Sequence, residues 1–152
     1  MAIYSFKRIQ QIPASVPAVW DFFASHANLQ LITPPGMNFK IISKYHGESI
    51  YPGQVIEYKL KPLLGIPLYW MTEITHVKEK EFFVDEQRKG PYRLWHHQHF
   101  FKAIPGGTEM TDIVHYENPF WIIGNIANAL YVKRKLKAVF DYRFKKVEEI
   151  FG

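Results

Sequence analysis

Histidines gather in one short stretch of this chain. Residues 93–101, with the sequence RLWHHQHFF, contain three of its seven histidines and one of its four tryptophans. An imidazole can bind a metal ion, transfer protons near neutral pH or form hydrogen bonds with a ligand. Because side chains alternate along a strand, an extended conformation places Trp95, His97 and His99 on one face and His96 on the other. We expect any chemistry to lie on the first of these faces.

Asp112 is the predicted acidic partner of these histidines. If residues 105–106 form a two-residue turn, counting back from it sets His99 directly opposite Asp112 and Trp95 opposite Tyr116 on the next strand. Directly opposed side chains have Cβ atoms about 5 Å apart, within reach of a hydrogen bond or a charge pair. A turn that is one residue longer would shift the register and lose this pairing.

The residues leave four interpretations of the pair open. His99 and Asp112 could simply satisfy each other as partly buried polar groups, or they could orient a bound ligand. As a catalytic pair, Asp112 would set the tautomer of His99 and raise its basicity. With His97 they also have the ligand types of a two-histidine, one-carboxylate metal centre, but Asp112 would then have to be both ligand and partner. We therefore expect no metal and no cofactor.

Aromatic residues form the second group of candidates. They make up 16% of the chain, which is high for a globular protein. Large flat side chains line cavities for apolar molecules as well as packing cores. We predict that a ligand cavity has in its wall, beside His97, His99 and Asp112, the aromatic residues Tyr58, Trp70, Trp95, Tyr116 and Tyr131.

Composition restricts the class of protein. A chain of 152 residues fits one domain, and we expect residues 1–152 to form it. The absence of cysteine excludes a disulfide scaffold and cysteine-ligated zinc or iron–sulfur sites. The first residues contain no long apolar run, so we expect no signal peptide, no membrane span and a cytoplasmic location. The sequence also contains no P-loop, dinucleotide fingerprint, HExxH motif or nucleophile elbow.

Much of the formal charge of +5 is concentrated near the C-terminus. Clustered Lys and Arg can bind nucleic acids or anionic membrane surfaces. The same clustering is typical of the solvent face of an amphipathic helix, which is the interpretation that we adopt. We therefore expect no nucleic-acid partner. The basic residues concerned are Lys133, Arg134, Lys135, Lys137, Arg143, Lys145 and Lys146.

Periodicity divides most of the chain into a strand, two short helices and six further strands. Residues 3–11 alternate as a strand, residues 13–23 have helical spacing with Ser15 as the N-cap, and residues 27–33 fit a short helix that must stop at Pro34. Short loops rich in Pro and Gly separate the later strands, which indicates an antiparallel meander. The predicted ranges of these strands are 39–45, 54–60, 67–77, 81–87, 92–101 and 108–116.

The last part of the chain has the pattern of one long helix. Asn118 can cap it, and an apolar stripe recurs at helical spacing as far as Phe151. About 30 residues would make a helix on the order of 45 Å long, which must lie across the sheet. The sequence thus predicts an α+β fold in which a curved, seven-stranded antiparallel sheet wraps around the C-terminal helix. The gap between the two would form a ligand cavity.

Segments spread over nearly the whole chain carry a family resemblance. The two most specific are FVDEQRKGPYRLWHHQHFF at residues 83–101 and GGTEMTDIVHYENP at residues 106–119. In these the chain resembles the SRPBCC superfamily, also called the START or Bet v 1-like helix-grip fold, and within it the polyketide cyclase/dehydrase-like ligand-binding proteins. Weaker support comes from VPAVWDFFASHANLQLITPPG, YPGQVIEYKL, YWMTEI and FDYR.

The resemblance implies a hydrophobic cavity but no shared catalytic set. Asp85 and Gln87 belong to the first motif, yet the loop that follows leaves open which face of the sheet they occupy. We predict binding of a small hydrophobic molecule, lipid-like, aromatic or polyketide-like, between sheet and helix. The alternative is a cyclase or dehydratase in which His99 and Asp112 transfer protons. A third hypothesis is a basic module that associates with membranes or polyanions, and a weak homodimer is compatible with each.

Overall fold

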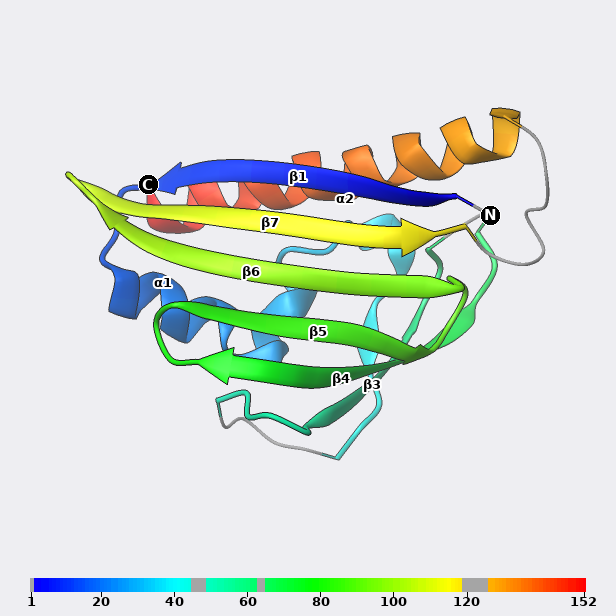
Figure 1. The fold of residues 1–152 in the computed structure, drawn as a ribbon, viewed down its shortest axis with the longest axis horizontal. Helices are drawn as coiled ribbons and strands as arrows, with labels where there is room; N and C mark the ends of the chain where they lie inside the picture. The colour runs from blue at the N-terminus through cyan, green and yellow to red at the C-terminus, as the bar shows by residue number, and fades with distance from the viewer. Residues whose placement is uncertain (1, 45–48, 63–64, 119–125) are drawn as a thin grey trace.

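Seven antiparallel strands form one sheet in the part of the chain that the computed structural model describes, residues 2–44, 49–62, 65–118 and 126–152. Figure 1 shows the sheet curving in front of two helices, α1 (Val16–Phe23) and α2 (Ile126–Phe151). This arrangement confirms the predicted α+β helix-grip architecture. In the order of the sheet, the strands are β1 (Ile3–Ile12), β7 (Gly107–Glu117), β6 (Leu94–Ile104), β5 (Phe82–Lys89), β4 (Leu68–Lys78), β3 (Val55–Leu60) and β2 (Lys40–Ile41).

The β6–β7 hairpin has the register predicted from its turn. Ile104 pairs with Gly107 across the turn, and Gly106 has a φ of +82°, which glycine adopts without steric cost. The register therefore places His99 opposite Asp112 and Trp95 opposite Tyr116, as expected.

The connection after α1 consists of 3₁₀ turns instead of the α-helix predicted for residues 27–33. One turn, η1, covers His26–Gln30, and a second, η2, covers Pro35–Met37. The two adjacent prolines at 34 and 35 explain the difference. Proline lacks the N–H that a helical hydrogen bond needs and disfavours the α conformation in the residue before it, so an α-helix has no room to continue here.

Strand β2 is shorter than the predicted strand at residues 39–45. The N–H of Ile42 still donates to the carbonyl of Glu57 at 2.9 Å, but the N–H of Glu57 donates to the hydroxyl of Ser43 at 3.3 Å. Because a side chain here replaces a backbone acceptor, the ladder ends. Residue 45, the last of this predicted strand, and residues 119–125, the predicted start of the long helix, are outside the described residues.

Both helices bury an apolar stripe against the same face of the sheet. The hydroxyl of Ser15 accepts a hydrogen bond from the N–H of Ala18 at 3.4 Å, which confirms the predicted N-cap of α1. Trp20 of α1 is 3% exposed and meets the rings of Phe83 and Phe101 edge-on. From residue 129 onward, where the side chains of α2 are described, its buried residues are Val132, Leu136, Phe140 and Val147.

Substitution of Gly107 by alanine should destabilise the fold. A Cβ atom at this position would lie 2.1 Å from the carbonyl oxygen of Ile12, where β1 and β7 meet. The backbone would have to shift, so we expect the free energy of unfolding to fall by about 1–3 kcal/mol in urea denaturation. Gly36, which has open space around it, is the control, and Gly36→Ala should change stability by less than about 0.5 kcal/mol. Equal stabilities of the two variants would contradict this prediction.

Candidate functional site

A cavity of about 170 Å³ lies between the sheet and α2. Strands β3 to β6, the 3₁₀ connection and one side of α2 supply its wall, which is mostly apolar. Tyr58, Trp70 and Trp95, all predicted to contact a ligand, are part of this wall. The indole of Trp70 is held in place because it meets the ring of Trp95 at 5.2 Å and donates a hydrogen bond to the hydroxyl of Thr72 at 3.0 Å.

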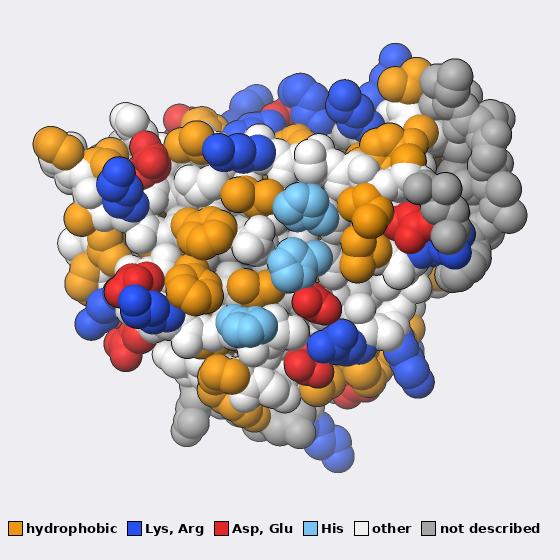
Figure 2. All heavy atoms as spheres, viewed as in Figure 1, with side chains coloured by type: hydrophobic (Ala, Val, Ile, Leu, Met, Phe, Trp, Pro, Cys, Tyr) orange, Lys and Arg blue, Asp and Glu red, His pale blue; other side chains and the backbone are white. Residues whose placement is uncertain are grey.

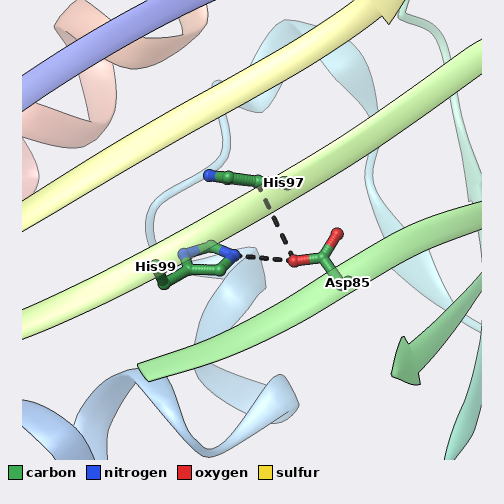
Figure 3. A group of neighbouring side chains, drawn as sticks. All are labelled: Asp85, His97 and His99. Carbon is green, nitrogen blue, oxygen red and sulfur yellow. Dashed lines mark hydrogen bonds and ion pairs between the residues drawn. The ribbon is translucent and has the colours of Figure 1, made fainter. Parts of the chain in front are cut away.

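Four polar residues meet on the sheet side of this cavity, and we call them the His–Asp cluster. Asp85 is directly opposite His97 on β5 and β6, and Asp112 is directly opposite His99 on β7 and β6. Figure 3 shows Asp85 beside His97 and His99, with a dashed line from each imidazole to its carboxylate. These three line the cavity, whereas Asp112 is buried on the other side of the imidazoles and is not part of the wall. The structure thus places Asp85 on the cavity face, which the sequence left open.

Hydrogen bonds in the cluster run between diagonal neighbours, whereas the directly opposed residues form only charge pairs. Nε2 of His97 lies 2.8 Å from Oδ1 of Asp112, and Nε2 of His99 lies 2.7 Å from Oδ2 of Asp85. Nδ1 of His99 is 3.0 Å from Oδ1 of Asp112, which makes the predicted charge pair without hydrogen-bond geometry. The register was therefore right, but the hydrogen bond to Asp112 comes from His97. An ionised carboxylate only accepts hydrogen bonds, so the proton of neutral His97 sits on Nε2.

Burial and mutual contacts set the protonation of the cluster. Burial lowers the pKa of His97, and the neighbouring His99 lowers it further, against the opposing effect of Asp112 and Asp85. Burial also acts to lower the pKa of His99, but its contacts with both carboxylates outweigh this and the pKa is raised. Burial alone would raise the pKa of Asp85 and Asp112, yet the imidazoles hold both below their ordinary range. At neutral pH the cluster therefore holds two carboxylates, with His99 the imidazole that protonates more readily.

Arg143 of α2 is a functional candidate that the sequence interpretation missed. It was assigned to the solvent face of the helix, but its half-buried side chain lines the cavity and its guanidinium lies 4.9 Å from the ring centroid of Phe140. Its Nε is buried without a hydrogen-bond partner among the described residues. Burial lowers the pKa of Arg143, against the opposing charges of Asp112 and Asp85. Its spacing from Leu136 and Phe140 was the signal that placed it on the buried stripe.

A comparable histidine–carboxylate pair lies on the outer face of the same strands. Nδ1 of His96 is 2.9 Å from Oε1 of Glu86, and both side chains are partly exposed. The ring of His115 on β7 lies beside that of His96. Figure 2 shows this outer face, with histidine side chains among hydrophobic and acidic ones. Because it differs from the inner pair mainly in burial, the outer pair is a built-in control for experiments on the cluster.

The remaining predicted residues lie away from the cavity wall. Tyr116 is 3% exposed and its ring packs on those of Tyr4 and Tyr92, so it supports the wall from behind. Tyr131 packs against the core from α2 and is not part of the described wall. The side-chain amide of Gln87 forms two hydrogen bonds with the backbone of Tyr92, and thereby closes the loop between β5 and β6.

The geometry of the cluster allows three kinds of chemistry: proton transfer to or from a ligand, hydrogen bonding to a ligand, and coordination of a metal ion. An imidazole and a carboxylate that face a cavity can donate or accept protons or hydrogen bonds at a ligand. One donor atom each from Asp85, His97 and His99 also lies within 4.8 Å of the others, so small side-chain movements would let them share a metal ion.

Solved structures share this arrangement of sheet and helices. A START superfamily protein from Mycobacterium smegmatis matches with a TM-score of 0.65 at 14% identity, covering 96% of this chain and 98% of the other. Major latex-like protein 151 from Panax ginseng matches with a TM-score of 0.59 at 14% identity, covering 90% and 96%. Ara h 8.0201, which is Bet v 1-like, matches with a TM-score of 0.64 at 14% identity, covering 96% and 98%.

This chain has the START/Bet v 1-like helix-grip fold. Identities this low establish the fold and nothing finer. No protein-family model and no curated protein matches the sequence. Within the described part of this helix-grip chain, no helix combines the length and the apolar character needed to cross a bilayer.

Proposed function

We propose that this helix-grip protein binds a small, mainly apolar molecule in the cavity between its sheet and α2. The observation that supports this is the wall itself, where aromatic and aliphatic side chains surround a few convergent polar groups. Ligand sites in proteins are typically built in this way. The START and Bet v 1-like neighbours share the fold that forms such a cavity.

The size of the cavity narrows the ligand class. An apolar cavity of about 150 Å³ accommodates benzene in a model system, so the 170 Å³ found here suits a single aromatic ring or a short branched chain. A lipid-sized molecule would require the wall to open. Hydrophobic burial would supply most of the affinity, while the unpartnered Nε of Arg143 and the imidazole of His97 would orient a polar substituent.

Filling the cavity should abolish this binding. Val139 of α2 is half-buried in the cavity wall, whereas the adjacent Ala138 is exposed. We expect Val139→Trp to weaken binding of toluene, phenol and benzoate at least about tenfold, because the indole occupies their space. The matched variant Ala138→Trp should bind like the wild type. Ligand-observed NMR and calorimetry measure the affinities, and equal binding by the two variants would overturn the proposal. Native mass spectrometry of protein from its own cell would identify the molecule.

Proton-transfer catalysis is a second candidate, favoured by one specific observation. His97 and Asp85 face the cavity, and Asp112 holds the proton of His97 on Nε2. A cyclase or dehydratase reaction would use such a group to move protons at a bound carbonyl compound. With such a substrate, His97→Gln should abolish turnover but leave binding within a few-fold of the wild type. Unchanged turnover would rule out this role.

A further inference from the structure

We propose that Asp85, His97 and His99 form a binding site for a divalent first-row metal ion, of the Zn²⁺ or Fe²⁺ class, facing the cavity. His97 and His99 are alternate residues of β6 and so share a face, and Asp85 on β5 is directly opposite His97. In Figure 3, dashed lines from both imidazoles meet at one oxygen of Asp85.

Each imidazole presents one nitrogen to Asp85 and the other to Asp112. Toward Oδ2 of Asp85, Nδ1 of His97 lies at 3.9 Å and Nε2 of His99 at 2.7 Å. Toward Oδ1 of Asp112, Nε2 of His97 lies at 2.8 Å and Nδ1 of His99 at 3.0 Å. Since Nε2 of His97 carries the proton, its Nδ1 has a lone pair available on the Asp85 side. Nε2 of His99 donates to Asp85, so it would release its proton to solvent when the ion binds.

Because Asp85 and Asp112 contact different nitrogens, the difficulty that the sequence raised for a metal site does not arise. There, Asp112 had to be both a metal ligand and the partner that orients the histidines. In the structure Asp85 supplies the third ligand, and Asp112 is free to fix the orientation of both imidazoles from behind. A carboxylate in this position is the usual companion of a metal-bound histidine. Two imidazoles and one carboxylate are the donor set of many zinc and non-haem iron centres.

The distances require only small side-chain movements. Donors that bind one ion at about 2.1 Å lie roughly 3.0–3.4 Å apart, so binding would lengthen the 2.7 Å contact of Asp85 and shorten the 3.9 Å contact. The two imidazoles lie 3.7 Å apart with a tilt of 32° and would rotate toward the ion. Asp85, His97 and His99 line the cavity, so the remaining coordination positions would face it. The site therefore suits an ion that also binds water or a ligand oxygen.

Metal titration of the tag-free, chelator-treated protein tests this inference. We expect one equivalent of Zn²⁺ to bind in calorimetry, and Co²⁺ to give visible absorption bands of a low-coordinate site. Asp85→Asn and His99→Gln should each weaken binding about 100-fold or more, and the positioning variant Asp112→Asn about 10–100-fold. The controls His96→Gln and Glu86→Gln remove the outer-face pair and should leave the affinity unchanged.

A variant at Arg143 tests the metal site without removing any of the residues that would coordinate the ion. Its positive charge lines the same cavity and opposes a cation, so Arg143→Gln should tighten Zn²⁺ binding several-fold. Circular dichroism confirms that each variant is folded. Absence of stoichiometric binding by the wild type, or loss of binding in His96→Gln instead of His99→Gln, would overturn the inference. These outcomes are independent of the proposed function, because cavity binding of toluene requires no metal.

Discussion

Replacing Asp112 with alanine should lower the free energy of unfolding by about 3–5 kcal/mol, the largest effect that we expect from one substitution here. Asp112 is 6% exposed, and its Oδ1 contacts His97 at 2.8 Å and His99 at 3.0 Å. Without this carboxylate, buried His97 loses its hydrogen-bond acceptor, and His99 loses one of the two carboxylates that stabilise its protonated form. Urea denaturation of the metal-free protein at pH 7 measures the difference.

The outer-face pair provides the matched control for this prediction. Glu86 contacts His96 at 2.9 Å across neighbouring strands, but about 30% of each side chain is exposed (28% and 32%). Water replaces the lost contact there, so Glu86→Ala should cost less than about 1 kcal/mol. Asp112→Asn keeps a hydrogen-bond acceptor for His97, so its loss of unfolding free energy should lie between those of Asp112→Ala and Glu86→Ala. If Asp112→Ala lowered the unfolding free energy no more than Glu86→Ala, burial would not explain the larger contribution expected from the inner pair.

Acidification from pH 5 to pH 3 should also destabilise the metal-free protein, by about 1 kcal/mol for each strongly paired carboxylate. The contacts with the imidazoles hold the pKa of Asp112 below its ordinary value of 3.8, and those with the imidazoles and Arg143 do the same for Asp85. A lowered pKa means that the unfolded chain binds protons more readily than the folded one. The stabilisation is thus fully present above about pH 4 and is lost as the pH falls.

The two histidines act near neutral pH and in opposite directions. The raised pKa of His99 gives stability below pH 6.5 that is lost as the pH rises, whereas the lowered pKa of His97 costs stability below pH 6.5. The loss of unfolding free energy on acidification should therefore be measured between pH 5 and 3, where protonation of the carboxylates causes most of the change. Denaturation curves at pH 5, 4 and 3 should drop less steeply for Asp112→Asn than for the wild type. Parallel pH profiles would show that Asp112 is not the group responsible.

Part of the site follows directly from local chain geometry. Residues 105–106 form a tight turn, and a turn of known length sets the pairing of the strands on either side, so the positions of His99 and Asp112 could be counted from the sequence. Strand alternation likewise identified His97 and His99 as the inner pair and His96 as an outer one.

Asp85 and Arg143 required the tertiary structure. The register of β5 against β6 depends on a longer loop, which the amide of Gln87 closes onto the backbone of Tyr92, and no local pattern fixes its length. Arg143 sits on a helix with many basic residues, and charge alone suggested solvent. Its spacing from Leu136 and Phe140 hinted at the buried stripe, but the packing of α2 on the sheet shows that its side chain lines the cavity.

The sequence alone determined the order of strands and helices, the helix-grip fold, the register of β6 and β7, and the face that carries the paired histidines. These properties follow from periodicity and turn length, which act between residues close in the chain. The tertiary structure decided which carboxylate binds which imidazole, the small size of the cavity and the inward direction of Arg143. Those depend on side chains that meet across strands and layers, where differences of an ångström or less select one hydrogen-bond partner over another.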